Sequence, residues 1–103
     1  DQIGRENLVK VIGKFRDEAS DRWRALAQAS SSADLARESH TLASTCCSFG
    51  LPATAEQLRA IEATAKAGGT VDAVADLDGI GEELETGLQL LRSVVAELTA
   101  TGP

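Results

Sequence analysis

Apolar side chains recur along this chain at steps of three and four residues, the spacing that gathers them on one face of an α-helix. In the first quarter of the chain this spacing predicts one long amphipathic helix, from about Gly4 to Ala29. Its apolar positions are Leu8, Ile12, Phe15, Ala19, Trp23 and Leu26. Polar residues fill the intervening positions, so the helix should bury one face and expose the other.

A run of serines, residues 30–32, interrupts the pattern before a second helix, predicted from Ala33 to about Phe49. Ser32 is expected to cap it, because a serine hydroxyl accepts a hydrogen bond from a free backbone N–H of the first turn. The apolar stripe of this helix is Leu35, Ser39, Leu42, Cys46 and Phe49. His40, the only histidine, points away from the stripe. Small residues surround it and leave room for a bulky partner: Ala36, Ala43, Ser44 and Cys47.

Gly50 and Pro52 mark a short turn, because glycine favours the end of a helix and proline the first turn of the next. The third helix has its apolar stripe at Leu51, Ala55, Leu58, Ile61 and Ala65, and should end at Gly68-Gly69. The short turn should place this helix antiparallel to the one that carries His40. Thr70 is predicted to cap a fourth helix, whose apolar positions are Leu77, Ile80, Leu84, Leu88, Leu91, Val95 and Leu98.

Four amphipathic helices with short links predict an all-α fold, an antiparallel up-down four-helix bundle. A chain of 103 residues provides one modest core, so we expect a single domain over residues 1–103. Its core should contain Phe15, Trp23, Leu42, Phe49, Leu58, Ile61, Leu84 and Leu91. The chain begins at Asp1, without Met, and the sequence leaves open whether it is a fragment of a longer protein.

The net charge of −6, without any run of Lys and Arg, disfavours binding to nucleic acid or to anionic lipid and favours protein partners. No stretch approaches the ~20 apolar residues of a membrane span, and no signal segment opens the chain, so we expect a cytoplasmic protein without membrane association. Cys46 and Cys47 are adjacent and point about 100° apart on a helix, which suits neither a disulfide nor paired metal ligands. We expect no metal site; His40 with Cys47, two turns away, remains a remote alternative.

The stretch from His40 to Gly50 resembles the motif of histidine-phosphotransfer (HPt) domains. In that motif His-x-Leu-Lys-Gly-Ser is followed by an apolar residue, and a Gly stands ten positions after the His. The positions that fit are His40, Leu42, Thr45, Phe49 and Gly50. Ala43 and Ser44 depart from the motif, because the family usually has Lys and Gly there. The resemblance covers most of the chain, since Phe15, Asp34-Leu35 and Leu58-x-x-Ile61-Glu62 also look like the family.

The resemblance implies a phosphoacceptor role for His40 and implies that Glu62, twenty-two residues later, orients its ring. The positive charge that the family draws from its lysine would come here from Arg37, Arg59 or Lys66. The other interpretation of Arg59, Glu62 and Lys66 is an ordinary solvated helix edge. A receiver domain is expected to dock over the small face made by Ala36, Ala43, Ser44 and Cys47.

Two functions remain open. The domain is either a phosphorelay intermediate, which carries a phosphoryl group between His40 and a receiver-domain aspartate, or a degenerate HPt domain that binds receivers or kinases without transfer. Its partners would be a response-regulator receiver domain, a hybrid histidine kinase, or both. The chain has neither a nucleotide-binding glycine-rich loop nor a catalytic acid cluster. We therefore expect no independent kinase activity and no intrinsic cofactor, with Mg²⁺ held by the partner receiver domain.

Overall fold

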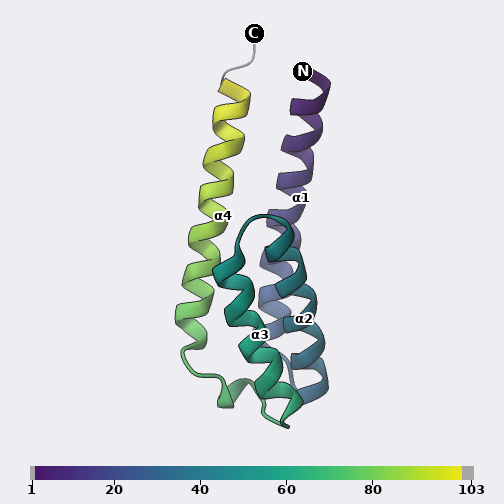
Figure 1. Ribbon diagram of the computed structural model, residues 1–103, viewed down its shortest axis with the longest axis vertical. Coiled ribbons are helices and arrows are strands. Elements are labelled where there is room, and N and C mark those ends of the chain that lie inside the picture. Colours follow the sequence, from purple (N-terminus) through teal and green to yellow (C-terminus); the bar gives the residue numbers. More distant parts are fainter. Residues whose placement is uncertain (1, 101–103) are drawn as a thin grey trace.

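The computed structural model describes residues 2–100, which form four α-helices and one short 3-10 helix without any strand. In chain order these are α1 (Gln2–Ala27), α2 (Ser32–Ser48), α3 (Pro52–Lys66), η1 (Val71–Ala73) and α4 (Leu77–Ala100). Successive α-helices run in opposite directions, so the predicted all-α, antiparallel up-down bundle is confirmed (Figure 1). None of the described helices is both long enough and apolar enough to span a bilayer.

The start of α2 differs by one residue from the prediction. Ser31, not Ser32, caps the helix: its backbone is extended, and its side chain accepts a hydrogen bond from the N–H of Asp34 at 3.1 Å. The hydroxyl of Ser32 instead donates to the carbonyl of Gly69 at 2.8 Å. This bond fastens the beginning of α2 to the segment that follows α3.

The turn between α2 and α3 forms as predicted. Gly50 adopts a left-handed backbone, with φ of +78°, which a residue without a Cβ tolerates best. The N–H of Leu51 then donates to the carbonyl of Cys46 at 2.9 Å, and Pro52 occupies the first turn of α3. These contacts fix a tight antiparallel hairpin of α2 and α3.

Thr70 does not cap the fourth helix, so that prediction is wrong. It precedes η1 and makes no side-chain capping bond, and α4 begins only at Leu77. Two valines of this link pack against the core: Val71, the first residue of η1, and Val74, which follows η1. Asp76, with φ of +54°, ends this link.

The core agrees with the prediction. Five of the expected side chains are buried in one cluster: Phe15, Leu42, Leu58, Ile61 and Leu84. The other three, Trp23, Phe49 and Leu91, are partly buried and pack against that cluster. The rings of Phe15 and Phe49 stack with their centroids 4.1 Å apart, which joins α1 to the end of α2.

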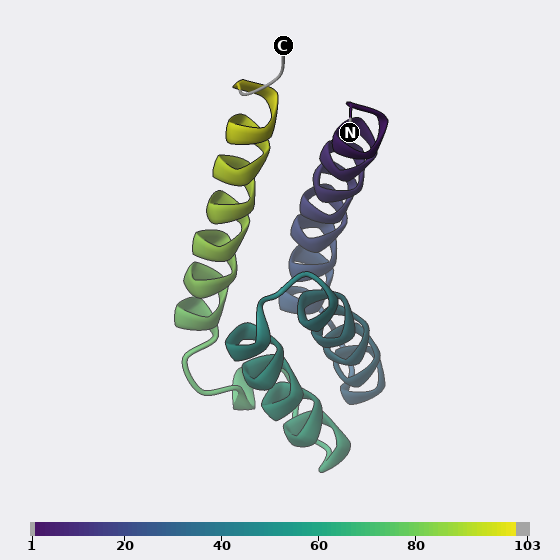
Figure 2. The same ribbon diagram turned by 45° about the horizontal axis from the view of Figure 1, so that its top comes forward.

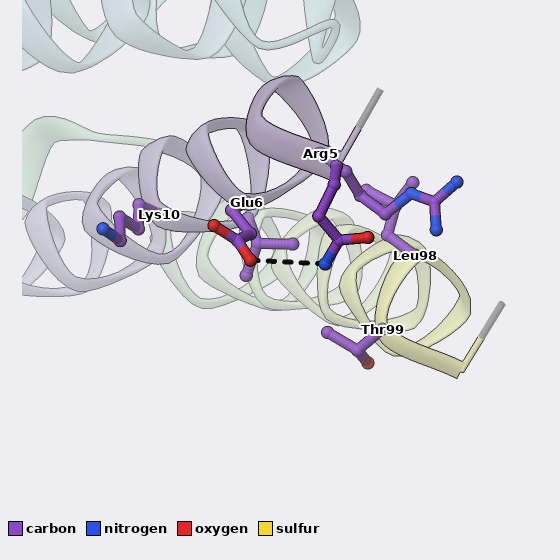
Figure 3. Close-up of a pocket in the computed structure, with 7 residues that line it drawn as sticks. Arg5, Glu6, Lys10, Leu98 and Thr99 are labelled. Atoms are coloured by element: carbon purple, nitrogen blue, oxygen red, sulfur yellow. Dashed lines mark hydrogen bonds between the residues drawn. The ribbon is translucent and has the colours of Figure 1, made fainter. Parts of the chain in front are cut away.

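The upper ends of α1 and α4 extend beyond the hairpin of α2 and α3 (Figures 1 and 2). Leu8, predicted to face the core, is 45% exposed there, because α2 and α3 end before they reach it. A hollow lies between these two ends, lined by Gln2, Arg5, Glu6, Val9, Lys10, Leu98 and Thr99 (Figure 3). None of its lining residues belongs to the stretch around His40.

Candidate functional site

His40 lies in the middle of α2 with its side chain 68% exposed. The opposite face of the helix is buried: Leu35, Ser39, Leu42 and Cys46 have no exposed surface. The buried hydroxyl of Ser39 is satisfied locally, since it donates to the carbonyl of Leu35 at 2.7 Å. The predicted orientation of α2, with its apolar stripe inward and His40 outward, is therefore confirmed.

Glu62, on the neighbouring helix α3, lies beside the imidazole. Its Oε2 is 3.1 Å and its Oε1 3.3 Å from Nδ1 of His40. The side chain of Glu62 is only 13% exposed, and the ammonium group of Lys66 lies 3.1 Å from the same Oε2. The structure thus brings together three of the residues predicted for the site: His40, Glu62 and Lys66.

Lys66 favours the ionised form of the Glu62 carboxyl group. The hydrogen bond from Lys66 is the largest influence on the pKa of Glu62 and lowers it; partial burial, the next largest, raises it, and the bond with His40 lowers it again, so that the net shift is downward. An ionised carboxylate can only accept hydrogen bonds. Nδ1 of a neutral His40 therefore carries the hydrogen and donates it to Glu62, which leaves the lone pair on Nε2, the other ring nitrogen.

Within residues 2–100, neither of the two arginines predicted for the site makes a hydrogen bond with His40. Arg37, one turn before it on α2, holds Asp34 at 2.8 Å and approaches Glu38 at 3.9 Å. Arg59 is exposed on α3, one turn before Glu62, and makes no ion pair within residues 2–100. The structure leaves the arginine of α3 as a cation without a carboxylate partner among these residues.

The small residues around His40 are not all on the surface. Ser44 and Cys47 are exposed and Ala36 is half-buried, but Ala43 is only 2% exposed, so its predicted place on an open docking face is wrong. Ala43 lies on α2 between the core stripe and His40, on the side where α3 packs. Its small side chain belongs to the seam between the two helices.

The two cysteines differ in their surroundings. Cys46 is fully buried, and burial raises the pKa of its thiol to about 11, so it stays protonated in the core. Cys47 is free and exposed, on the same side of α2 as His40. Among the described residues, no three His, Cys, Asp or Glu side chains are grouped so that they could hold a metal ion.

The fold and the site define a helical bundle that presents one accessible histidine, held through Nδ1 by a carboxylate of the next helix. A model of the Hpt domain family matches residues 10–98, and the chain belongs to this family. The predicted family is thereby confirmed. Hpt domains take part in histidine phosphotransfer in phosphorelays, where they interact with receiver domains and histidine kinases. No curated protein and no solved structure gives a significant match to the chain.

The contact of Glu62 with both His40 and Lys66 is only weakly indicated by the sequence. The spacing of Glu62 and Lys66 predicts no more than an i, i+4 ion pair on a helix surface. In the structure the same carboxylate oxygen also meets His40. That shared contact depends on how α3 is rotated against α2, which spacing within one helix does not define.

Proposed function

We propose that this domain is a phosphorelay intermediate. It accepts a phosphoryl group on Nε2 of His40 from the aspartate of one receiver domain and passes it to the aspartate of another. The contact that carries the proposal is the one between Glu62 and Nδ1 of His40. A hydrogen bond from Nδ1 to this carboxylate orients the ring, and the 68% exposure of the side chain leaves the imidazole accessible, as a nucleophile that serves another protein requires.

The transfer step needs no base from this chain. Nε2 of the neutral imidazole attacks phosphorus, the P–O bond to the partner's aspartate breaks, and its electron pair remains on that carboxylate. The hydrogen on Nδ1 stays in its bond to Glu62, whose negative charge offsets the positive charge of the phosphorylated ring. Mg²⁺ and the aspartate pocket belong to the receiver domain, so the reaction centre is assembled between two proteins.

The partner is proposed to be a receiver domain, of a response regulator or of a hybrid histidine kinase, with the cytoplasm as the expected location. Docking would cover Ser44 and Cys47, which are exposed, and the edge of Ala36. A contact of this kind has apolar atoms at its centre and charge at its rim. The charged rim is available here in Arg37, Arg59 and Lys66.

A second function rests on Ala43. Its buried methyl group supplies no charge where the family usually has lysine. A domain that had lost the reaction would keep the bundle and the docking face, and would act as a binding module for receivers or kinases. Uptake of acid-labile phosphate from a phosphorylated receiver domain distinguishes the two functions, because only the intermediate takes it up.

Replacing Glu62 by Ala is expected to slow phosphoryl transfer to His40 about tenfold or more without abolishing it. The substitution removes the hydrogen bond that orients the ring but leaves the nucleophile. Rates of transfer from a phosphorylated receiver domain measure the effect, with Glu56→Ala, exposed on the same helix, as the matched control. Equal rates for Glu62→Ala and the parent protein would show that the carboxylate does not orient the ring.

Replacing Ser44 by Trp is expected to block receiver binding while the bundle stays folded. Ser44 is exposed one turn after His40, so an indole there would occupy the docking face without entering the core. Titration calorimetry with an unphosphorylated receiver domain measures binding, and Ser93→Trp, exposed on α4, is the control. Unchanged affinity for Ser44→Trp would mean that receivers dock elsewhere.

A further inference from the structure

The seam between α2 and α3 has an uncharged gap one turn beyond His40, at Ala43. A phosphoryl group on Nε2 carries negative charge on its oxygens and needs a positive group beside it. Ala43 carries no charge. Because it is buried, a cation at this level of the two helices has to reach the phosphoryl group from the exposed edge of the seam. Such a cation can come from either of the two helices that form the seam.

The register of the two helices identifies the residue of α3 that lies at this level. Ser32 bonds to Gly69 and His40 to Glu62, so numbers on α3 fall as those on α2 rise. One turn forward from His40 to Ala43 therefore corresponds to one turn back from Glu62 to Arg59. Arg59 is exposed, while Leu58 and Ile61 beside it are buried, so the arginine lies on the outer edge of α3.

The ion pairs distinguish the three nearby cations. The guanidinium of Arg37 is held 2.8 Å from Asp34, toward the start of α2 and away from Ala43. The ammonium group of Lys66 is held 3.1 Å from Glu62. Arg59 makes no ion pair within residues 2–100, so it can turn toward an incoming anion without breaking one.

We infer that Arg59 supplies, from α3, the positive charge for the phosphoryl group on His40, and that Lys66 is a positioning residue that holds Glu62. This inference rests on the proposed function. Packed helices lie about 8–10 Å apart, and Arg59 is displaced from Glu62 by one turn of about 5 Å, distances that a long arginine side chain spans. Its planar guanidinium can donate two parallel N–H bonds to phosphoryl oxygens. Arg59 makes and breaks no covalent bond in the step.

The test compares Arg59→Gln and Arg59→Lys with Arg92→Gln, an exposed arginine of α4, as the matched control. Each variant receives phosphate from a phosphorylated receiver domain and, separately, from phosphoramidate, a small donor that needs no docking. We expect Arg59→Gln to slow uptake at His40 about tenfold or more with both donors. Arg59→Lys should slow it less, because lysine keeps the positive charge but loses the paired N–H bonds. Arg92→Gln should match the parent protein.

If Arg59→Gln slows uptake from the receiver domain but not from phosphoramidate, Arg59 acts in docking and the inference is overturned. Uptake by Arg59→Gln at the parent rate with both donors would also overturn it. Ala43→Lys in the Arg59→Gln background should restore uptake if the two positions serve one anion, and failure of a folded double variant to do so also counts against the inference. Should the buried lysine prevent folding, the comparison of Gln with Lys at position 59 still decides. If the parent protein takes up no phosphate from either donor, the proposed function itself fails, whatever Arg59 does.

Discussion

Replacing His40 by Gln is expected to abolish phosphoryl uptake by this domain and to leave the bundle folded. The imidazole is the proposed nucleophile, and an amide nitrogen cannot replace it because its lone pair is delocalised. The side chain of His40 is 68% exposed and its contact is with Glu62, so little packing is lost. Acid-labile phosphate measures transfer, and circular dichroism with thermal unfolding measures the fold.

The control for His40→Gln is receiver binding, which should persist because Ser44 and Cys47 remain in place. Acid-labile phosphate on the variant would show that another residue is the acceptor. The parent protein tests the alternative function. If it binds receivers but takes up no phosphate from several donors, the domain is a binding module.

Replacing Leu42 by Ala is expected to lower the free energy of unfolding by about 2–5 kcal/mol, the range for a leucine removed from a packed core. Leu42 has no exposed surface and lies in the cluster that joins the helices. Urea unfolding monitored by circular dichroism measures the change. Leu90→Ala is the matched control: Leu90 is 63% exposed, so its loss should change stability by less than about 0.5 kcal/mol.

A loss below about 1 kcal/mol at Leu42 would mean that the core has collapsed around the cavity or that the residue packs less tightly than its burial indicates. The urea unfolding curves of Leu42→Ala and Leu90→Ala should also differ. Leu42→Ala should shift the midpoint without changing the slope, because the surface exposed on unfolding stays nearly the same.

The helices and their order were predictable because the apolar spacing is regular over long stretches. In α2 the spacing placed Leu35, Leu42 and Cys46 inward and His40 outward, as the structure has them. Gly50 and Pro52 defined the turn by their backbone preferences, and a turn that short leaves little alternative to an antiparallel hairpin. These features depend on neighbours in sequence, which explains why sequence was sufficient.

The errors involve relations between helices. Leu8 continues the apolar stripe of α1, but spacing within α1 says nothing of where α2 and α3 end. Ala43 lies at the border of a stripe, so a small rotation of α2 decides whether it faces solvent or α3. Ser31 and Ser32 are both suited to cap α2. In the structure Ser31 is the cap, and the hydroxyl of Ser32 donates to Gly69 instead.

The proposed site was predictable to a similar extent. The pairing of His40 with Glu62 came from the family resemblance, and the structure brings the two side chains into contact. The resemblance left three cations as equal sources of charge. The choice among these three cations depends on the ion pairs that Arg37 and Lys66 make, which the sequence does not define.

The hairpin of α2 and α3 carries both His40 and Glu62 and is tied at both ends, by the Gly50 turn and by the bond from Ser32 to Gly69. The residues that must meet are therefore close along the chain, and contacts of short sequence separation cost little chain entropy to form. Fraying at the outer ends of α1 and α4 can occur without separating the imidazole from its carboxylate. A change in the length or surface of the outer ends of α1 and α4 should therefore leave the position of His40 relative to Glu62 unaltered.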